Sequence, residues 1–245
     1  MQYSPSVALF YQAQQTTLKE PEQRTGGLLA YAPVFPGTSA IQAATRATPF
    51  AGERITPLPE TEREVSQLAR LFQENDHQTQ TSLHQSASEH ALKESELEQY
   101  RFLHVATHGF VNEAEPDLSG LLLYPDSTAG EDGLLAVGEV YNLRLNTDLV
   151  TLSACETGIG QIANGEGVLG FTRAFLYAGA ERVLVSLWQV QDTATAELML
   201  AFYERILQTP SPDYSSQLQQ AKLQLINSDN YSHPYYWSPF VLIRG

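Results

Sequence analysis

The sequence predicts an α/β fold in which a mainly parallel central sheet is covered by helices on both faces. From residue 101 onward, short apolar runs alternate with amphipathic helical segments, which is the pattern of strands joined by helices. Two of these runs, 148–154 and 182–188, are almost continuously apolar, as is typical of strands buried on both faces. A chain of 245 residues can form one large core, so we expect a single domain over residues 1–245.

The first hundred residues predict helices, one strand and a long loop. The expected elements are a helix over 2–13, a strand over 27–33, a loop over 34–56, a helix over 58–73 and a helix over 86–100. The loop is assigned because proline, glycine, serine and threonine recur through it. Thr61 followed by Glu64 fits a capping box at the start of the helix over 58–73.

The remainder of the chain predicts alternating strands and helices. The strands are expected at 102–107, 120–125, 148–154, 182–188 and 239–245, and the helices at 165–180, 192–208 and 215–228. Gly179 stands where a glycine commonly ends a helix. Asp192 stands where an acidic N-cap commonly begins one.

Composition excludes several classes of function. The formal net charge is −14, so the chain has no basic excess for nucleic acid, and we expect no nucleic-acid partner. No apolar run approaches the roughly 20 residues of a membrane-spanning helix, so we expect no membrane partner. One cysteine cannot form an internal disulfide, and the first residues lack the basic region of a signal peptide. A cytoplasmic location is the expectation.

The single cysteine, Cys155, directly follows one apolar run, and His108 directly follows another. Functional residues of α/β sheets gather beyond the carboxyl ends of the strands, so both side chains are candidates for one site. An adjacent imidazole can lower the pKa of a thiol from about 8.5 and make it nucleophilic. The alternative is a buried structural cysteine, which is the commoner role of a lone thiol. His104 lies inside its apolar run and is interpreted as a core residue.

A series of motifs resembles the CHAT domain, a family similar to caspases and separases that often follows tetratricopeptide repeats in bacterial proteins. The motifs, in order, are "HVATHGF", "LSACETGIG", "GEGVLGFTRAFL" and "VLVSLWQVQD". The resemblance implies a caspase-like three-layer sandwich, with Cys155 as nucleophile and His108 as general base or ion-pair partner. It also implies a protein substrate and a regulatory partner that is a sensor or contains tetratricopeptide repeats. This chain is then expected to be either a fragment of a repeat-containing protein or a partner to one. No cofactor and no metal are expected.

The implied reaction is cleavage of a specific protein through a thioacyl-enzyme. Cys155 attacks the scissile carbonyl, and His108 protonates the departing amine. The developing oxyanion is expected to bind the backbone N–H groups of Cys155 and Gly109. The alternative is a catalytically silent member of the family that acts as a protein-binding scaffold.

Five residues are candidates for substrate binding. Ser153, two positions before the cysteine, is neutral and gives no sign of a charged pocket. "SLWQVQD" resembles the separase segment "LWDVTD", but Gln189 replaces the first acid, so a preference for arginine is not implied. Asp192 matches the second acid, yet it also suits a helix N-cap. Ser186 and Trp188 are candidates for the pocket or for contact with the substrate strand.

Two other motifs are interpreted as structural. "GIGQIA", residues 158–163, formally fits a dinucleotide-binding fingerprint, but the acid required later, Glu181, precedes its strand instead of ending it. The glycines are better explained by a flexible active-site loop over 158–167. Tyr235, Tyr236 and Trp237 are interpreted as a packing cluster, with a wall of the substrate site as the alternative.

Overall fold

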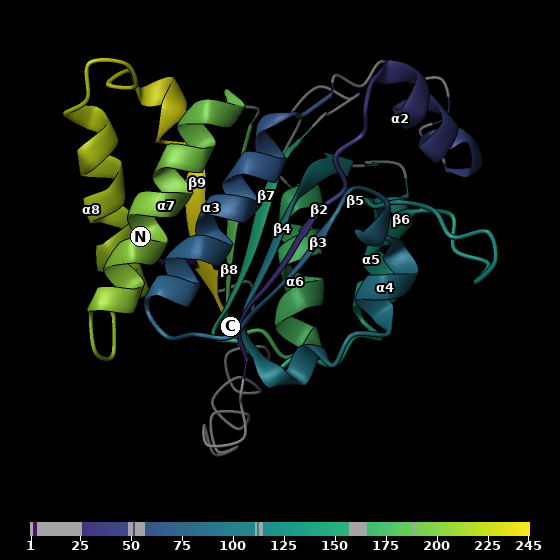
Figure 1. Ribbon diagram of the computed structural model, residues 1–245, viewed down its shortest axis with the longest axis horizontal. Coiled ribbons are helices and arrows are strands. Elements are labelled where there is room, and N and C mark those ends of the chain that lie inside the picture. The colour runs from purple at the N-terminus through teal and green to yellow at the C-terminus, as the bar shows by residue number, and fades with distance from the viewer. Residues whose placement is uncertain are drawn as a thin grey trace.

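In the computed structural model, three layers are stacked, with the sheet in the middle and helices on either side (Figure 1). The structure describes residues 2–3, 26–48, 51, 57–110, 112, 115–156, 166–188 and 190–245, and for 2–3, 47, 154–156 and 166–169 it describes the backbone only. The helix expected over 2–13 therefore lies largely outside the described residues.

The sheet runs in the order β1-β9-β8-β7-β4-β2-β3, with β5 pairing β4 and β6 pairing β5. Its strands are β1 (Gln2–Tyr3), β2 (Gly26–Ala32), β3 (Thr79–Leu83), β4 (Tyr100–Phe110), β5 (Gly120–Leu122), β6 (Leu134–Ala136), β7 (Leu149–Glu156), β8 (Arg182–Ser186) and β9 (Phe240–Arg244). The central pairs β3–β2, β2–β4, β4–β7 and β7–β8 are parallel, whereas β9 is antiparallel to β8 and the β5–β6 hairpin is antiparallel to β4. The predicted fold class, a mainly parallel sheet between helices, is confirmed.

One face of the sheet is covered by α3 (Glu60–Glu74), α7 (Asp192–Gln208) and α8 (Tyr214–Ile226), which lie together on one side in Figure 1. Side chains alternate along a strand, so β2 turns Leu28 and Ala30 to this face. There they join a core with Val65, Leu68 and Phe72 of α3. These apolar residues share one side of α3, as the predicted helical period requires.

The other face is covered by α4 (Glu89–Lys93), α5 (Val137–Val140) and α6 (Glu166–Ala178). Leu29 and Tyr31 of β2 point to this second core, where they join Phe171 and Phe175 of α6. Strands β2, β4, β7 and β8 are thus buried on both faces, which explains why β7 and β8 are nearly continuously apolar.

Several expected elements differ from the structure. The stretch 34–56, expected to be a loop, contains α2 (Thr38–Ala44), which buries Ile41 against Phe35. Strand β3 was not expected, because its sequence TQTSL is polar and it forms an edge of the sheet. The helix expected over 86–100 is only α4, because Tyr100 already belongs to β4. The 3-10 helices are η2 (Thr45–Ala47), η3 (His84–Ser86), η4 (Leu97–Gln99), η5 (Pro116–Leu118) and η6 (Pro234–Tyr236).

Two predicted helix caps are wrong, and both acids have other roles. Pro59 occupies the N-cap position of α3, and the Thr61 hydroxyl donates to the carbonyl of Leu58 instead of capping the helix. Asp192 is the first residue of α7, one position after the N-cap, and makes no capping hydrogen bond.

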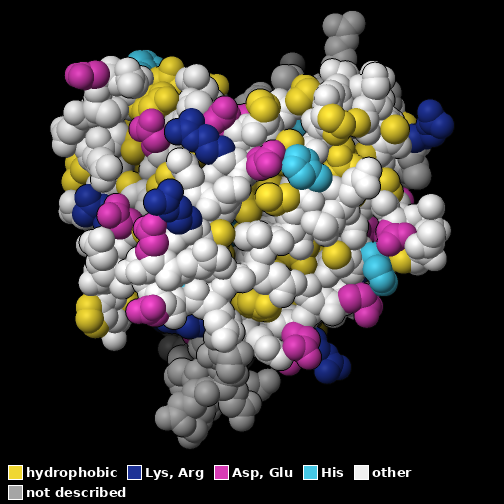
Figure 2. All heavy atoms as spheres, viewed as in Figure 1, with side chains coloured by type: hydrophobic (Ala, Val, Ile, Leu, Met, Phe, Trp, Pro, Cys, Tyr) yellow, Lys and Arg dark blue, Asp and Glu magenta, His cyan; other side chains and the backbone are white. Residues whose placement is uncertain are grey.

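On the face seen in Figure 2, side chains of both charge signs are interspersed over α3, α7 and α8. Among the described residues, no helix is long and apolar enough to cross a membrane.

Candidate functional site

The two candidate catalytic residues lie on adjacent parallel strands. His108 of β4 and Cys155 of β7 are Cα partners in the ladder, so their backbones are direct neighbours. Adjacent strands lie about 4.8 Å apart, which brings these two positions within reach of one substrate group. The backbone therefore brings together the two residues expected at the strand ends. The Cys155 side chain lies outside the described part of the structure.

His108 is a buried imidazole that has no hydrogen-bond partner among the described side chains and backbone groups. Its side chain is only 2% exposed, and neither Nδ1 nor Nε2 has a hydrogen-bond partner among the described residues. Buried polar groups are normally hydrogen-bonded, because an unpaired one costs about 1–3 kcal/mol. Such a group in a folded protein needs an explanation, and a catalytic role is one of them.

Burial lowers the pKa of His108 from 6.5 to about 4. The cause is desolvation, which disfavours the charged imidazolium. His108 is thus neutral near pH 7, with a free lone pair that can accept a proton. This protonation state suits a general base better than a permanent ion-pair partner of a thiolate.

Gly109 lies between two strands, opposite Glu156 of β7 and Leu121 of β5. The adjacent Thr107 hydroxyl donates to the carbonyl of Leu122. The β5–β6 hairpin is therefore attached to β4 immediately beside His108.

Ser153 and Ser186 are buried near the ends of β7 and β8, 6% and 4% exposed. The Ser186 hydroxyl donates to the carbonyl of Trp188 at 2.6 Å, and the Trp188 indole donates to the carbonyl of Tyr235 at 3.2 Å. These bonds attach the turn after β8 to the segment around η6. Gln189 lies outside the described residues.

Asp192 lines a cavity of about 530 Å³ at the start of α7. The cavity is lined by Glu60, Val190, Gln191, Asp192, Thr193, Tyr235 and Tyr236. Tyr235 and Tyr236 thus form part of a cavity wall as well as packing on each other. Among the described residues no ion-pair partner is found for Asp192, whereas the other acid of this wall, Glu60, pairs with Arg63 at 3.4 Å.

Burial, together with the negative charges of Glu64 and Glu60, raises the pKa of Asp192 from 3.8 to about 6. Both effects disfavour the carboxylate. A positively charged group in the cavity would reverse them, because it would favour the ionised form of Asp192.

Glu64, whose charge acts on Asp192, forms a buried pair with His104. Glu64 Oε1 of α3 is 2.9 Å from His104 Nε2, and their side chains are 3% and 0% exposed. His104 is confirmed as a core residue, but its acidic partner was not expected.

His108 lies four residues beyond His104 and, by alternation along β4, faces the same side of the sheet. Glu60 and Glu64 were missed because their approach to β4 and α7 depends on the packing of α3.

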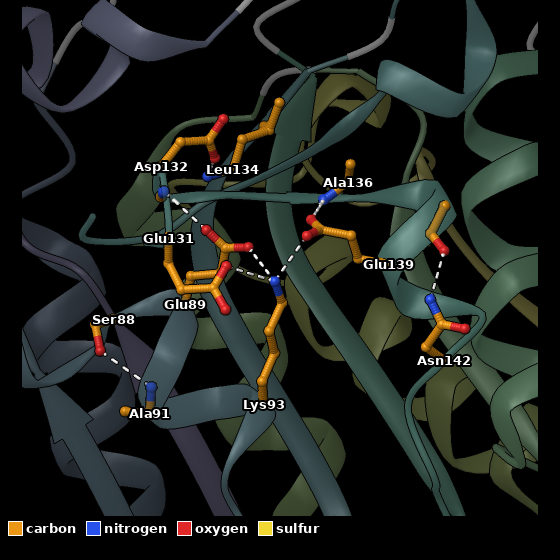
Figure 3. Close-up of polar contacts among 12 residues, drawn as sticks. Ser88, Glu89, Ala91, Lys93, Glu131, Asp132, Leu134, Ala136, Glu139 and Asn142 are labelled. Atoms are coloured by element: carbon orange, nitrogen blue, oxygen red, sulfur yellow. Dashed lines mark hydrogen bonds and ion pairs between the residues drawn. The ribbon is translucent and has the colours of Figure 1, made fainter. Parts of the chain in front are cut away.

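One cluster of carboxylates has a geometry that suits a cation. Ligand oxygens of Glu89, Glu131 and Glu139 lie within 4.8 Å of one another. The Lys93 ammonium lies among them and supplies the positive charge (Figure 3).

The arrangement defines a caspase-like α/β protein, with a histidine and a cysteine at the carboxyl ends of adjacent strands. Comparison with solved structures agrees: the chain matches the Arg-specific cysteine proteinase gingipain R with a TM-score of 0.59 and 9% sequence identity. The match covers 94% of this chain and 50% of the gingipain chain. The CHAT domain model matches residues 1–245, and the chain therefore belongs to the CHAT family.

Two curated relatives are tetratricopeptide repeat protein 28 of Mus musculus and of Homo sapiens. Each is 37% identical over 110 residues, which is 45% of this chain. The match spans only 4% of the length of either relative. The similarity thus concerns a small part of long proteins whose names refer to tetratricopeptide repeats.

Proposed function

We propose that this chain is a caspase-like cysteine endopeptidase that cleaves a specific protein with Cys155 and His108. The observation that carries the proposal is the buried imidazole of His108, which has no partner within the described part of the chain and lies at the ladder position opposite Cys155. A structural histidine at such a position would be expected to have a partner, as His104 has in Glu64.

In the proposed reaction, Cys155 Sγ attacks the scissile carbonyl carbon as its proton passes to the neutral imidazole of His108. The imidazolium then donates this proton to the amine nitrogen as the C–N bond breaks, leaving a thioester on Cys155. His108 then accepts a proton from water as the water oxygen attacks the thioester carbonyl. The C–S bond breaks, the acid is released, and the imidazolium returns its proton to Cys155 Sγ. The backbone N–H groups of Gly109 and Cys155 are the proposed donors to the oxyanion.

Regulation is part of the proposal. His108 is 2% exposed, so a substrate carbonyl must gain access to it before reaction. A sensor or repeat-containing partner that rearranges the surrounding segments would control that access, and repeats occur in the names of both curated relatives. A protein that cleaves a specific partner needs such control.

We also propose that the cavity at Asp192 receives a lysine or arginine side chain of the substrate. Asp192 supplies the carboxylate on its wall that has no ion-pair partner among the described residues, since Glu60 is paired with Arg63. Tyr235 and Tyr236 offer aromatic surface for an alkyl stem or a guanidinium group. The structural neighbour is described as Arg-specific, which is consistent with this preference.

A peptide library cut by the wild-type chain tests the proposal. Products should appear with wild type and disappear in Cys155→Ala and in His108→Ala, with His84→Ala as the matched histidine control because His84 is exposed. Cleavage that persists in Cys155→Ala would overturn the nucleophile assignment.

The scaffold alternative is favoured by the burial of His108 and by relatives named for tetratricopeptide repeats. It predicts no cleavage by any variant, together with partner binding that Cys155→Ala leaves unchanged. A pull-down with wild type and Cys155→Ala, compared with the cleavage result, separates the two functions.

A further inference from the structure

Two exposed tyrosines contact each other on the outer side of α5 and α6, which pack together on one face of the sheet (Figure 1). Tyr177 of α6 is 53% exposed, and Tyr141, which directly follows α5, is 39% exposed. Their ring centroids are 5.3 Å apart, and the rings meet edge to face at 73°. Single apolar side chains on a surface are common, but these two come from different elements and form one aromatic patch. Tyrosine is enriched in protein interfaces, because its ring is apolar and its hydroxyl can bond to water or to a partner.

Two arginines flank the tyrosines. Arg173 lies one helical turn before Tyr177 on the exposed side of α6. Arg144 precedes Leu145, whose N–H donates to the Ala178 carbonyl at 2.8 Å, so the backbone holds Arg144 beside the end of α6. Both arginines are exposed, and within the described part of the chain neither guanidinium group has a hydrogen bond or an ion pair.

The lack of an acidic partner is notable because the chain has 28 acidic and only 14 basic residues. Four other arginines each pair with a carboxylate, namely Arg63, Arg70, Arg101 and Arg182. The carboxylate of α5, Glu139, is bound by Lys93 at 2.7 Å. The outer side of α5 and α6 therefore has a local positive charge next to its aromatic patch. Its four side chains form the Tyr–Arg surface, which comprises Tyr141, Arg144, Arg173 and Tyr177.

We propose that the Tyr–Arg surface binds an acidic segment of a partner protein, which packs an apolar side chain on the tyrosine rings. Carboxylates of this segment pair with the two guanidinium groups, whose planar donors suit such pairs. Tyrosine and arginine are also the residue types that contribute most to binding at protein interfaces. Charges are screened beyond about 8 Å at physiological ionic strength, so a narrow segment meets these local charges. An anionic membrane or a second copy of the chain would also face the net charge of −14 over a wider area.

The position of the surface leaves the candidate catalytic site free. Tyr177 lies near the end of α6, close to the start of β8, whereas Cys155 lies near the end of β7, which is parallel to β8. The two sites therefore lie toward opposite edges of the sheet. Helix α6 connects β7 to β8, so a partner bound there contacts an element linked in sequence to both strands. This position suits the regulatory partner proposed above, and only that role rests on the proposed function, because docking itself requires no peptidase activity.

Fluorescence anisotropy of a labelled peptide tests the docking, with the full chain carrying Cys155→Ala so that no turnover occurs. The probe is a peptide with a central leucine and tryptophan flanked on both sides by aspartates. The matched peptide has asparagines in place of the aspartates. The aspartate peptide should bind about tenfold more tightly, and its advantage should decrease as the salt concentration rises. Equal affinities of the two peptides, or no binding of the aspartate peptide, would overturn the proposal.

Variants locate the bound peptide. Arg173→Glu and Arg144→Glu should each weaken binding of the aspartate peptide about tenfold or more and change binding of the asparagine peptide little. Tyr177→Ala should weaken binding of both peptides, because it removes apolar contact. The controls are Arg46→Glu on η2 and Leu223→Ala on α8, which replace exposed side chains elsewhere and should bind as wild type. Equal losses in Arg173→Glu and Arg46→Glu would show that the charges act at a distance, and the proposed surface would be wrong.

Two further measurements examine the other occupants. Self-association in analytical ultracentrifugation that Arg173→Glu abolishes would assign the surface to a second copy of the chain. Binding to phosphatidylserine vesicles that Arg173→Glu abolishes would assign it to a membrane. Either result would overturn the acidic partner segment. All substituted side chains are exposed, so the variants should fold, which circular dichroism checks. Because no readout involves cleavage, failure of the docking proposal leaves the proposed peptidase function untouched.

Discussion

Two histidines four residues apart on β4 differ in the feature that decides their chemistry. His104 shares its buried position with Glu64, whereas His108 has no partner among the described residues. The order of apolar residues in the sequence was enough to predict a core position for His104. For His108 it predicted a place directly after the strand, whereas β4 continues for two more residues, to Phe110. The absence of a partner for His108 depends on side chains brought close by packing, so the sequence could not show it.

The low pKa of His108 predicts a specific dependence of stability on pH. Because the folded pKa is about 4 and the ordinary value is 6.5, the unfolded chain binds a proton more readily between these values. Stability should therefore fall as pH drops from 6.5 through 4. At pH 4.5 the loss attributable to His108 should be about 2–3 kcal/mol relative to pH 7.

Urea denaturation at pH 7 and at pH 4.5 gives the change in the free energy of unfolding between the two pH values. The contribution of His108 is this change in wild type minus the same change in His108→Gln. The exposed His84→Gln substitution is the control, which should keep the wild-type dependence on pH. If the free energy of unfolding changes equally with pH in wild type and His108→Gln, the imidazole is not held neutral by burial.

Asp192 is expected to determine the preference for a basic side chain. Its pKa is raised to about 6, so Asp192 becomes negatively charged as pH rises through that value. Binding of a peptide with arginine before the cleavage position, measured with Cys155→Ala to prevent turnover, should tighten over the same range. Asp192→Asn should weaken it about tenfold, which corresponds to about 1.4 kcal/mol.

Glu197→Gln is the matched control for this test, since Glu197 is an exposed acid on the same helix, α7. A norleucine peptide should show no such dependence on Asp192. Equal binding of the arginine peptide by wild type and Asp192→Asn would remove the cavity from the substrate site.

At the scale of elements, prediction succeeded where one physical signal dominated. Strands β7 and β8 have continuous apolar runs, and α3 has an apolar face at helical spacing, so their positions were clear. Strand β3 was not predicted, and of the β5–β6 hairpin only β5 was. Short or polar strands depend on a neighbouring strand for their stability, so the sequence alone indicates them poorly.

Two glycines of the α6 region give a matched test of element stability. Gly179 has φ +116°, and a Cβ there would lie 2.1 Å from the Leu145 carbonyl oxygen. Gly179→Ala should therefore lower the free energy of unfolding by about 2 kcal/mol or more. Gly170 lies within α6, and outside the backbone of α6 no atom of the described residues comes within 4 Å of an added Cβ, so Gly170→Ala should raise the free energy of unfolding by about 0.5–1 kcal/mol. Urea denaturation measures both, and a neutral Gly179→Ala would contradict the tight turn after α6.

At the scale of the whole molecule, the three layers explain why the candidate site lies where it does. Parallel strands direct the ends of β4, β7 and β8 to one edge, and α3 and α7 begin near that edge. The CHAT motifs predicted this arrangement, and 9% sequence identity with gingipain R shows that the fold persists when most residues differ. The acidic cavity could not be predicted in full, because its wall combines the starts of α3 and α7 with η6, three segments distant in sequence.

The most direct test of the catalytic pair uses the fact that Cys155 is the only cysteine of the chain. A peptide-based electrophile that reacts with thiols therefore reports on Cys155 alone, and intact mass gives the rate of labelling in the folded chain. The account predicts that wild type and His84→Ala are labelled at the same rate. Labelling of His108→Ala should be at least a hundredfold slower, which is the effect expected from loss of a general base. Equal rates in wild type and His108→Ala, or no labelling of folded wild type while the unfolded chain is labelled, would contradict it.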